Sequence, residues 1–187
     1  MLSILSLWLP ILVSAVAVFF VSWIIHMFLP YHRNDFDKLP EEEGVMDALR
    51  GFDLPEGDYH FPHCAGPKEM ASSEFAEKMK RGPVGLVTVM KSGPPAMGKE
   101  LVQWFIYCIV VSIFAAYISG QALAPGAHYL KVFQLAGCVA FTGYSLALVQ
   151  NAIWFKRKWS STLKSMFDGL VYGLVTAGVF GWLWPGA

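Results

Sequence analysis

The chain has 187 residues, of which 55% are hydrophobic and 15% are aromatic. Its mean hydropathy of +0.46 is too high for an ordinary water-soluble domain and indicates an integral membrane protein, with the lipid bilayer as its first partner. Fourteen Lys and Arg balance fourteen Asp and Glu, so the net charge gives no support for a nucleic acid as a partner.

The first predicted element is a transmembrane helix within residues 1–30. From Leu2 to Pro30 the chain contains no Asp, Glu, Lys or Arg, and about 20 apolar residues are enough to cross the hydrocarbon core. Residues 15–17 have the form of a signal-peptidase site, but no basic segment precedes them and the apolar run continues. We therefore expect a retained anchor. His26, near its inner end, is interpreted as an interfacial group, with a proton relay as the alternative.

Residues 31–100 are expected to form a small, partly ordered cap, because about 70 residues rich in Pro and Gly scarcely form a large core. The stretch "SSEFAEKMKRG" predicts a short amphipathic helix near 72–81, with a serine cap at its start and a glycine after it. This helix lies either on the membrane surface or on the rest of the cap. The apolar segment 83–90 is too short to span and is expected to be a strand or an extended segment at the headgroup level.

Within the cap, "HFPHC" places His60, His63 and Cys64 close together, and with His32 they are suitable ligands for a soft divalent metal. A structural zinc site usually has four ligands in recognisable pairs, and a second pair of cysteines is missing. A polar loop with one thiol is the favoured interpretation, and neither a metal nor another cofactor is expected. A catalytic role is disfavoured, because no base, oxyanion donor or phosphate cradle accompanies these residues.

Three further transmembrane helices are expected within residues 101–187, at about 101–120, 132–155 and 163–184. A chain exposed to lipid must satisfy its backbone hydrogen bonds internally, and the connections between these spans are short. The predicted fold is therefore an all-α membrane protein, an up-and-down bundle of four transmembrane helices with a small cytoplasmic cap between helices 1 and 2.

The positions of Lys and Arg predict the orientation. Residues 31–100 carry nine of them, and the connector before the last span carries Lys156, Arg157, Lys158 and Lys164. The amino terminus, the turn at 121–129 and the carboxy-terminal tail carry none. The positive-inside rule then places residues 31–100 in the cytoplasm and both termini outside, in the periplasm of a bacterial inner membrane.

Small residues recur every four positions in the last and the second spans. In a helix this spacing places them in one row, which lets a neighbouring helix approach closely. The rows are Gly169, Gly173, Ala177 and Gly181 in the last span, and Cys108, Ser112, Ala116 and Gly120 in the second. They predict close helix packing and are poor material for a wide pore.

A polar row, Asp168, Tyr172 and Thr176, runs beside the small row of the last span and is expected to face protein. If Lys164 marks the interface, Asp168 lies only about 6 Å inside it, within reach of headgroups or of Lys164. The favoured interpretation is an anchoring or helix-pairing role for Asp168. The alternative is a role in ion or proton transfer.

Two stretches, "EKMKRGPVGLVTVMKSGPPAMGKELVQWF" at 77–105 and "SMFDGLVYGLVTAGVFGWLWP" at 165–185, resemble small uncharacterised bacterial inner-membrane proteins. The resemblance covers most of residues 70–185 and implies a bacterial origin. It supplies no activity, substrate or site.

The favoured function is a structural or accessory subunit of a larger membrane assembly, respiratory or photosynthetic, with other membrane subunits or further copies of this chain as partners. The sequence lacks the chain of intramembrane charges, the discontinuous helices and the internal repeat that transporters show. The alternative is a small transporter or channel component with a path along Asp168, Tyr172, Gln134 and Gln150.

Overall fold

The computed structural model describes residues 2–186 and divides them into two compact units. The helical unit consists of Met1–Phe36 and Ala96–Ala187, and the cap unit consists of Asp37–Pro95. Four helices are long and apolar enough to cross a membrane, namely Ile4–Phe28, Gly98–Ala122, Tyr129–Trp154 and Trp159–Trp182. The prediction of a mostly helical chain with four apolar helices is confirmed, and these helices suggest a multi-pass membrane protein.

The first span begins with a 3-10 turn, η1 (Ile4–Leu7), and continues as α1 (Trp8–Phe28). Pro10 is accommodated because it lies in the first turn of α1, where backbone N–H groups have no partner within the helix. The helix ends before Pro30, which disfavours a helical conformation at Leu29. A second 3-10 turn, η2 (Pro30–His32), follows directly.

The second span is α5 (Gly98–Ala122), and the last is α8 (Trp159–Trp182). The third span, expected as one helix over 132–155, consists of α6 (Tyr129–Ser145), a 3-10 turn η3 (Leu146–Leu148) and α7 (Val149–Trp154). Ser145 has non-helical angles of φ −124° and ψ −52°, and its hydroxyl donates to the carbonyl of Met166 on α8 at 3.2 Å. The interruption therefore lies where a hydrogen bond joins two spans.

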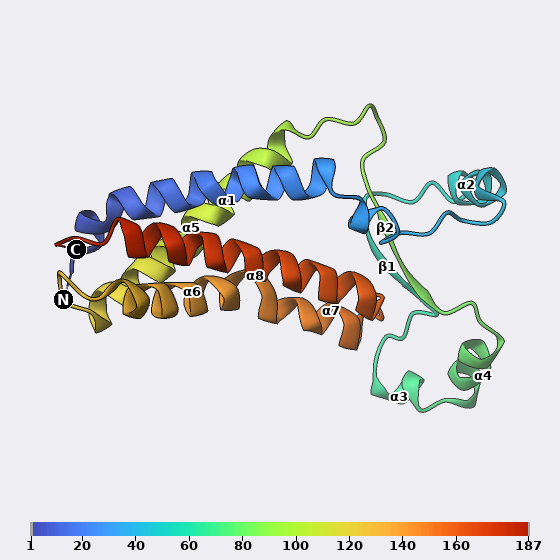
Figure 1. The fold of residues 1–187 in the computed structure, drawn as a ribbon. Coiled ribbons are helices and arrows are strands. Elements are labelled where there is room, and N and C mark those ends of the chain that lie inside the picture. The colour runs from blue at the N-terminus through green and yellow to red at the C-terminus, as the bar shows by residue number, and fades with distance from the viewer. Residues whose placement is uncertain (1, 187) are drawn as a thin grey trace. The chain divides into compact units, whose positions relative to one another are not determined.

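The four spans form a ring in which α1 packs on α5 and α8, and α6 packs on the same two helices. Both termini lie at one end of this ring (Figure 1), as an even number of spans requires. Backbone hydrogen bonds of 2.8 Å from Leu2 to Gly120 and from Gly126 to Pro185 join the ends of the spans there.

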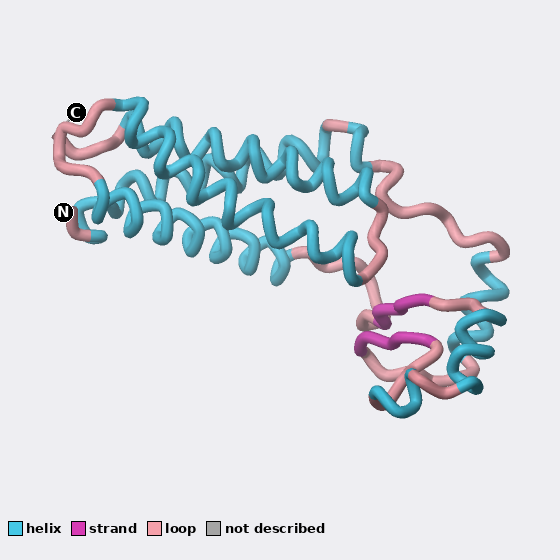
Figure 2. Tube along the Cα trace, turned by 90° about the horizontal axis from the view of Figure 1, so that it is seen from below, coloured by secondary structure: helices cyan, strands magenta, loops and turns pink. Residues whose placement is uncertain are grey.

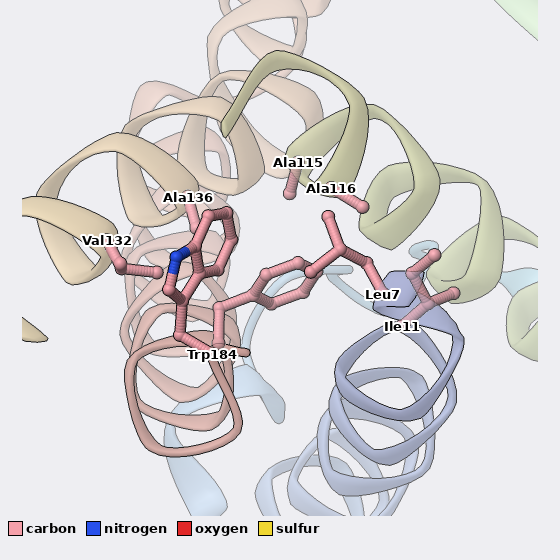
Figure 3. Packing of buried hydrophobic residues seen from close by; sticks show 8 residues of the cluster. Leu7, Ile11, Ala115, Ala116, Val132, Ala136 and Trp184 are labelled. Atoms are coloured by element: carbon pink, nitrogen blue, oxygen red, sulfur yellow. The ribbon is translucent and has the colours of Figure 1, made fainter. Parts of the chain in front are cut away.

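A core of buried apolar side chains fills the end of the bundle near the termini (Figure 3). All four spans or their flanking turns contribute, and Trp184 closes the core with its indole N–H donating to the carbonyl of Ala124 at 3.0 Å. The core comprises Leu7, Ile11, Ala115, Ala116, Val132, Ala136, Phe180 and Trp184.

Both rows of small residues lie at helix contacts inside the chain. On α8, Gly173 lies against Phe141 and Gly137 of α6, and Ala177 lies against Gly137. On α5, the Ser112 hydroxyl accepts a hydrogen bond of 3.0 Å from Ser14 of α1. These rows are covered by the chain's own helices, so they are not available to a partner.

The cap unit contains a two-stranded antiparallel sheet, β1 (Gly57–Phe61) with β2 (Gly85–Val89), drawn in magenta in Figure 2. The register pairs Tyr59 with Val87. Three helices complete the unit: α2 (Glu42–Arg50), α3 (Pro67–Met70) and α4 (Ser73–Arg81). None of the residues from Asp37 to Pro95 is buried.

Helix α4 occupies the segment where the sequence predicts a helix near 72–81. The Ser72 hydroxyl accepts from the Phe75 N–H at 3.1 Å, and Gly82 follows with a φ of +60° that glycine adopts readily. Helix α2 is not among the elements that the sequence predicts for the cap. Its first turn carries Glu42 and Glu43, and its last carries Arg50, as the helix dipole favours.

We expect Gly169→Ala to lower the stability of the bundle by about 1–3 kcal/mol, because a methyl group there would collide with the Ser145 hydroxyl and lie 3.1 Å from the Tyr144 Cβ. The matched control is Gly178→Ala on the same helix, where the nearest atom is 3.9 Å away. Thermal unfolding in detergent measures both variants, and equal midpoints would contradict the packing described for α8.

Candidate functional site

A network of polar side chains surrounds Asp168 at the end of the bundle away from the termini. Asp168 lies on α8 and is only 3% exposed. Its Oδ1 accepts a short hydrogen bond from the hydroxyl of Tyr31, and its Oδ2 lies 2.8 Å from Nε2 of His32. The buried carboxylate is therefore held by two residues of the 3-10 turn η2.

His32 lies between two carboxylates. Its Nδ1 is 2.7 Å from Oδ2 of Asp35, while its Nε2 faces Asp168. The other oxygen of Asp35 accepts from Nζ of Lys164 at 2.9 Å. The network thus consists of two acidic groups, one lysine, one histidine and the hydroxyl of Tyr31.

Asp35 is held as an ionised carboxylate. Its burial opposes ionisation, but hydrogen bonds from His32 and Lys164 outweigh burial and lower its pKa to about 2. Burial and the hydrogen bond to Asp168 both raise the pKa of Tyr31, so its hydroxyl remains a donor. The protonation states of these two groups are consistent with the hydrogen bonds that they make.

The local sequence explains how η2 reaches α8. Leu29, before Pro30, is extended with a ψ of 130°, and Pro30 fixes the first residue of the new turn. This change of direction at the end of α1 brings Tyr31 and His32 against Asp168 on α8. The two segments are 136 residues apart in the sequence at the bond between His32 and Asp168.

A cavity of about 530 Å³ lies next to this network, within the helical unit. Residues from all four spans line it, and most of them are apolar or aromatic. The lining residues are Phe19, Ser22, Trp23, His26, Met27, Met97, Leu101, Trp104, Tyr107, Tyr144, Leu148, Ser165, Asp168 and Tyr172. Asp168 is therefore part of the cavity wall and also of the ion network, which consists of Tyr31, His32, Asp35, Lys164 and Asp168.

Two tyrosine hydroxyls at this cavity have no hydrogen-bond partner. Tyr172 is 4% exposed and Tyr144 is 6% exposed, and their rings meet edge to face with 5.5 Å between centroids. Tyr144 lies beside the thiol of Cys108, and a thiol is a weak hydrogen-bonding group. By contrast, Tyr107 at the same cavity donates to the carbonyl of Gly143 at 2.6 Å. A buried hydroxyl without a partner is costly, so these two donors favour a ligand oxygen nearby.

No protein-family model, no curated protein and no solved structure matches the chain.

Within residues 2–186, one group of side chains is suited to bind a metal ion. Nitrogens of His26 and His32 and a carboxylate oxygen of Asp168 lie within 4.8 Å of one another. The weak candidates His60, His63 and Cys64 are in the cap unit and form no such group. His60 contacts the carbonyl of Pro62 and Cys64 that of Gly66.

Two residues of the polar row predicted on the last span, Asp168 and Tyr172, line the cavity. The third, Thr176, is buried, and its hydroxyl donates to the Tyr172 carbonyl at 2.9 Å. Lys164, considered as a partner for Asp168, contacts Asp35 instead. Gln134 and Gln150 do not line the cavity.

Sequence reasoning missed Tyr31 and Asp35 and considered His32 only as a ligand of the cap. One signal was present: outside the cap unit the chain has only three acidic residues, Asp35, Glu100 and Asp168. Two of these three form the network. A count of acidic residues near the spans would have drawn attention to Asp35.

We expect Asp35→Asn to destabilise the helical unit at neutral pH by about 2–4 kcal/mol, since an uncharged amide with one acceptor oxygen cannot replace the carboxylate for both Lys164 and His32. The carboxyl has a pKa of about 2 in the folded protein against an ordinary value of 3.8. Its contribution is therefore present above about pH 4 and is lost as the pH falls towards 2.

Thermal unfolding of wild type and variant across this range measures the effect, and the difference between their midpoints should shrink in acid. Asp53→Asn is the control, because Asp53 is an exposed residue of the cap whose left-handed backbone asparagine also adopts. A difference that stays constant with pH would contradict the ionised state of Asp35.

Proposed function

We propose that the helical unit binds a small, neutral, lipid-soluble molecule that carries carbonyl or hydroxyl oxygens. One observation carries the proposal: the buried hydroxyls of Tyr144 and Tyr172 lack partners and line the same cavity as Asp168. In a bundle exposed to lipid, such donors lack the water that would satisfy them at a surface.

The size and walls of the cavity support this class of ligand. Its volume of about 530 Å³ lies in the range of small-molecule sites, which are mostly apolar with a few polar groups that fix orientation. The rings of Trp104, Tyr107, Tyr144 and Tyr172 form a continuous cluster with centroid separations of 5.5 to 6.1 Å. A flat ring or an apolar chain packs well on such a surface.

The polar groups of the cavity wall narrow the class of ligand further. The Asp168 carboxylate accepts a hydrogen bond from a ligand hydroxyl. The two tyrosine hydroxyls donate to a ligand oxygen. Quinones and quinols combine a flat ring, such oxygens and an apolar tail, so a short-chain quinone is a suitable probe.

We expect purified protein to bind decylubiquinone saturably, and Tyr172→Phe to weaken the affinity by about 3- to 10-fold through loss of one hydrogen bond. Quenching of tryptophan fluorescence reports binding, since Trp23 and Trp104 line the cavity. The matched control is Tyr117→Phe, which changes an exposed tyrosine of α5 outside the cavity. Absence of saturable binding, or equal affinity of the two variants, would contradict the proposal.

The role of an accessory subunit in a larger membrane assembly is a second proposal, and the cap unit favours it. Its 59 residues from Asp37 to Pro95 include no buried side chain, so the unit has no core of its own. On α2, Val45, Met46 and Leu49 form one apolar face, and all three are exposed. A partner that covers this face would supply the missing burial.

The charge of the cap unit favours a protein as that partner over the bilayer surface. The unit carries eleven Asp and Glu against seven Lys and Arg, an excess of acidic groups that an anionic lipid surface repels. Amphipathic helices that bind membranes are instead rich in basic residues on their polar face. Helix α2 begins with Glu42 and Glu43.

We expect the protein to co-purify with other membrane subunits in mild detergent and Leu49→Glu to release them, because it places a charge on the apolar face of α2. Gly44→Glu is the control, since it adds the same charge on the opposite face, where a side chain meets nothing within 4 Å. Native mass spectrometry measures both. A wild-type chain that runs alone at its own mass would overturn the accessory role.

Transport along Asp168 stays an alternative prediction. The orientation with both termini in the periplasm stays a prediction from the positions of Lys and Arg. The participation of Asp168 and Tyr172 in one cavity supports a binding step rather than a continuous path, because Gln134 and Gln150 lie outside it.

A further inference from the structure

We propose that His26, His32 and Asp168 bind a divalent first-row transition metal ion, with zinc and iron(II) as the best matches, at the wall of the cavity. The three side chains offer two imidazole nitrogens and one carboxylate oxygen within 4.8 Å of one another. Two histidines and one carboxylate form a common ligand set for both ions, and they leave coordination positions open for a ligand.

Hydrogen bonds made by the two histidines prepare them for this role. The Nδ1 of His26 lies 2.9 Å from the carbonyl of Ser22, which can only accept, so this nitrogen carries a proton. In a neutral ring the lone pair is then on Nε2. In His32, Nδ1 faces the carboxylate of Asp35 in the same way, and Nε2 faces Asp168. Metal-binding histidines are commonly oriented by just such a carboxylate or carbonyl on the other nitrogen.

The charges of the network call for one further cation. Asp35 and Asp168 bring two negative charges, and Lys164 opposes one of them. A metal ion between His32 and Asp168 would neutralise the other.

The site also has a route of access. His26 is exposed and, like Asp168, lines the cavity, so the open coordination positions face the space where the proposed ligand binds. The rings of His26 and His32 are stacked, with 7° between their planes and 4.9 Å between centroids. Since a metal lies near the plane of each ring that binds it, binding by both requires the two rings to tilt.

The test uses the full chain in detergent. Metal content is measured by mass spectrometry of protein purified without chelator, and metal-free protein is then titrated with Co²⁺, whose visible bands report coordination by nitrogen and oxygen. We expect about one zinc or iron per chain and one Co²⁺ site. His26→Gln should weaken Co²⁺ binding by on the order of 100-fold or more, and Asp35→Asn by about 10- to 100-fold through His32.

His26→Gln is the decisive variant, because the only hydrogen bond described for His26 is to a carbonyl of its own helix, and the variant keeps the ion network intact. His63→Gln, in the cap unit, is the control and should bind Co²⁺ as wild type does. The inference is overturned if wild type binds no stoichiometric metal, if His26→Gln binds as tightly as wild type, or if His63→Gln removes the metal. The inference shares its cavity with the proposed function, and measuring decylubiquinone binding on metal-free protein separates failure of one from failure of the other.

Discussion

The arrangement of the helical unit depends on one requirement, that the carboxylate of Asp168 be neutralised where water is scarce. An isolated charge inside a protein or bilayer costs several kcal/mol, and it is tolerated when donors surround it. Here the donors come from the turn after α1, through Tyr31 and His32, and Asp35 links them to Lys164. The segment that follows the first span is thereby fixed against the last one, and the cavity is formed beside this junction.

Close packing of α8 on α6 positions the same carboxylate. Gly169, next to Asp168, lets the backbone of α8 approach Tyr144 and Ser145. Ser145 in turn donates to Met166, at the interruption that separates α6 from α7. One turn of α8 therefore carries a helix contact on one face and the ion network on the neighbouring face, so a change in either alters the cavity wall.

The sequence predicts the four spans well, because each is a long apolar run, but it does not predict the break at Ser145. The residues around that break are as apolar as their neighbours, and only the contact with α8 distinguishes them. The site is predicted in part. Asp168 is conspicuous in an uncharged run, whereas its partner His32 lies 136 residues away and is placed by the turn at Pro30. In the cap, the frequent Gly and Pro hid α2, although Val45 and Leu49 have helical spacing.

The two ends of the bundle differ in composition, and this difference supports the proposed binding site. At the end near the termini, Leu7, Phe180 and Trp184 close the bundle with apolar packing. A buried ion pair adds little stability compared with such packing, and its replacement by apolar residues is often neutral or stabilising. The other end instead combines charged groups with two unpaired tyrosine hydroxyls beside a cavity. Buried polar groups gathered around one space are the arrangement expected of a binding site.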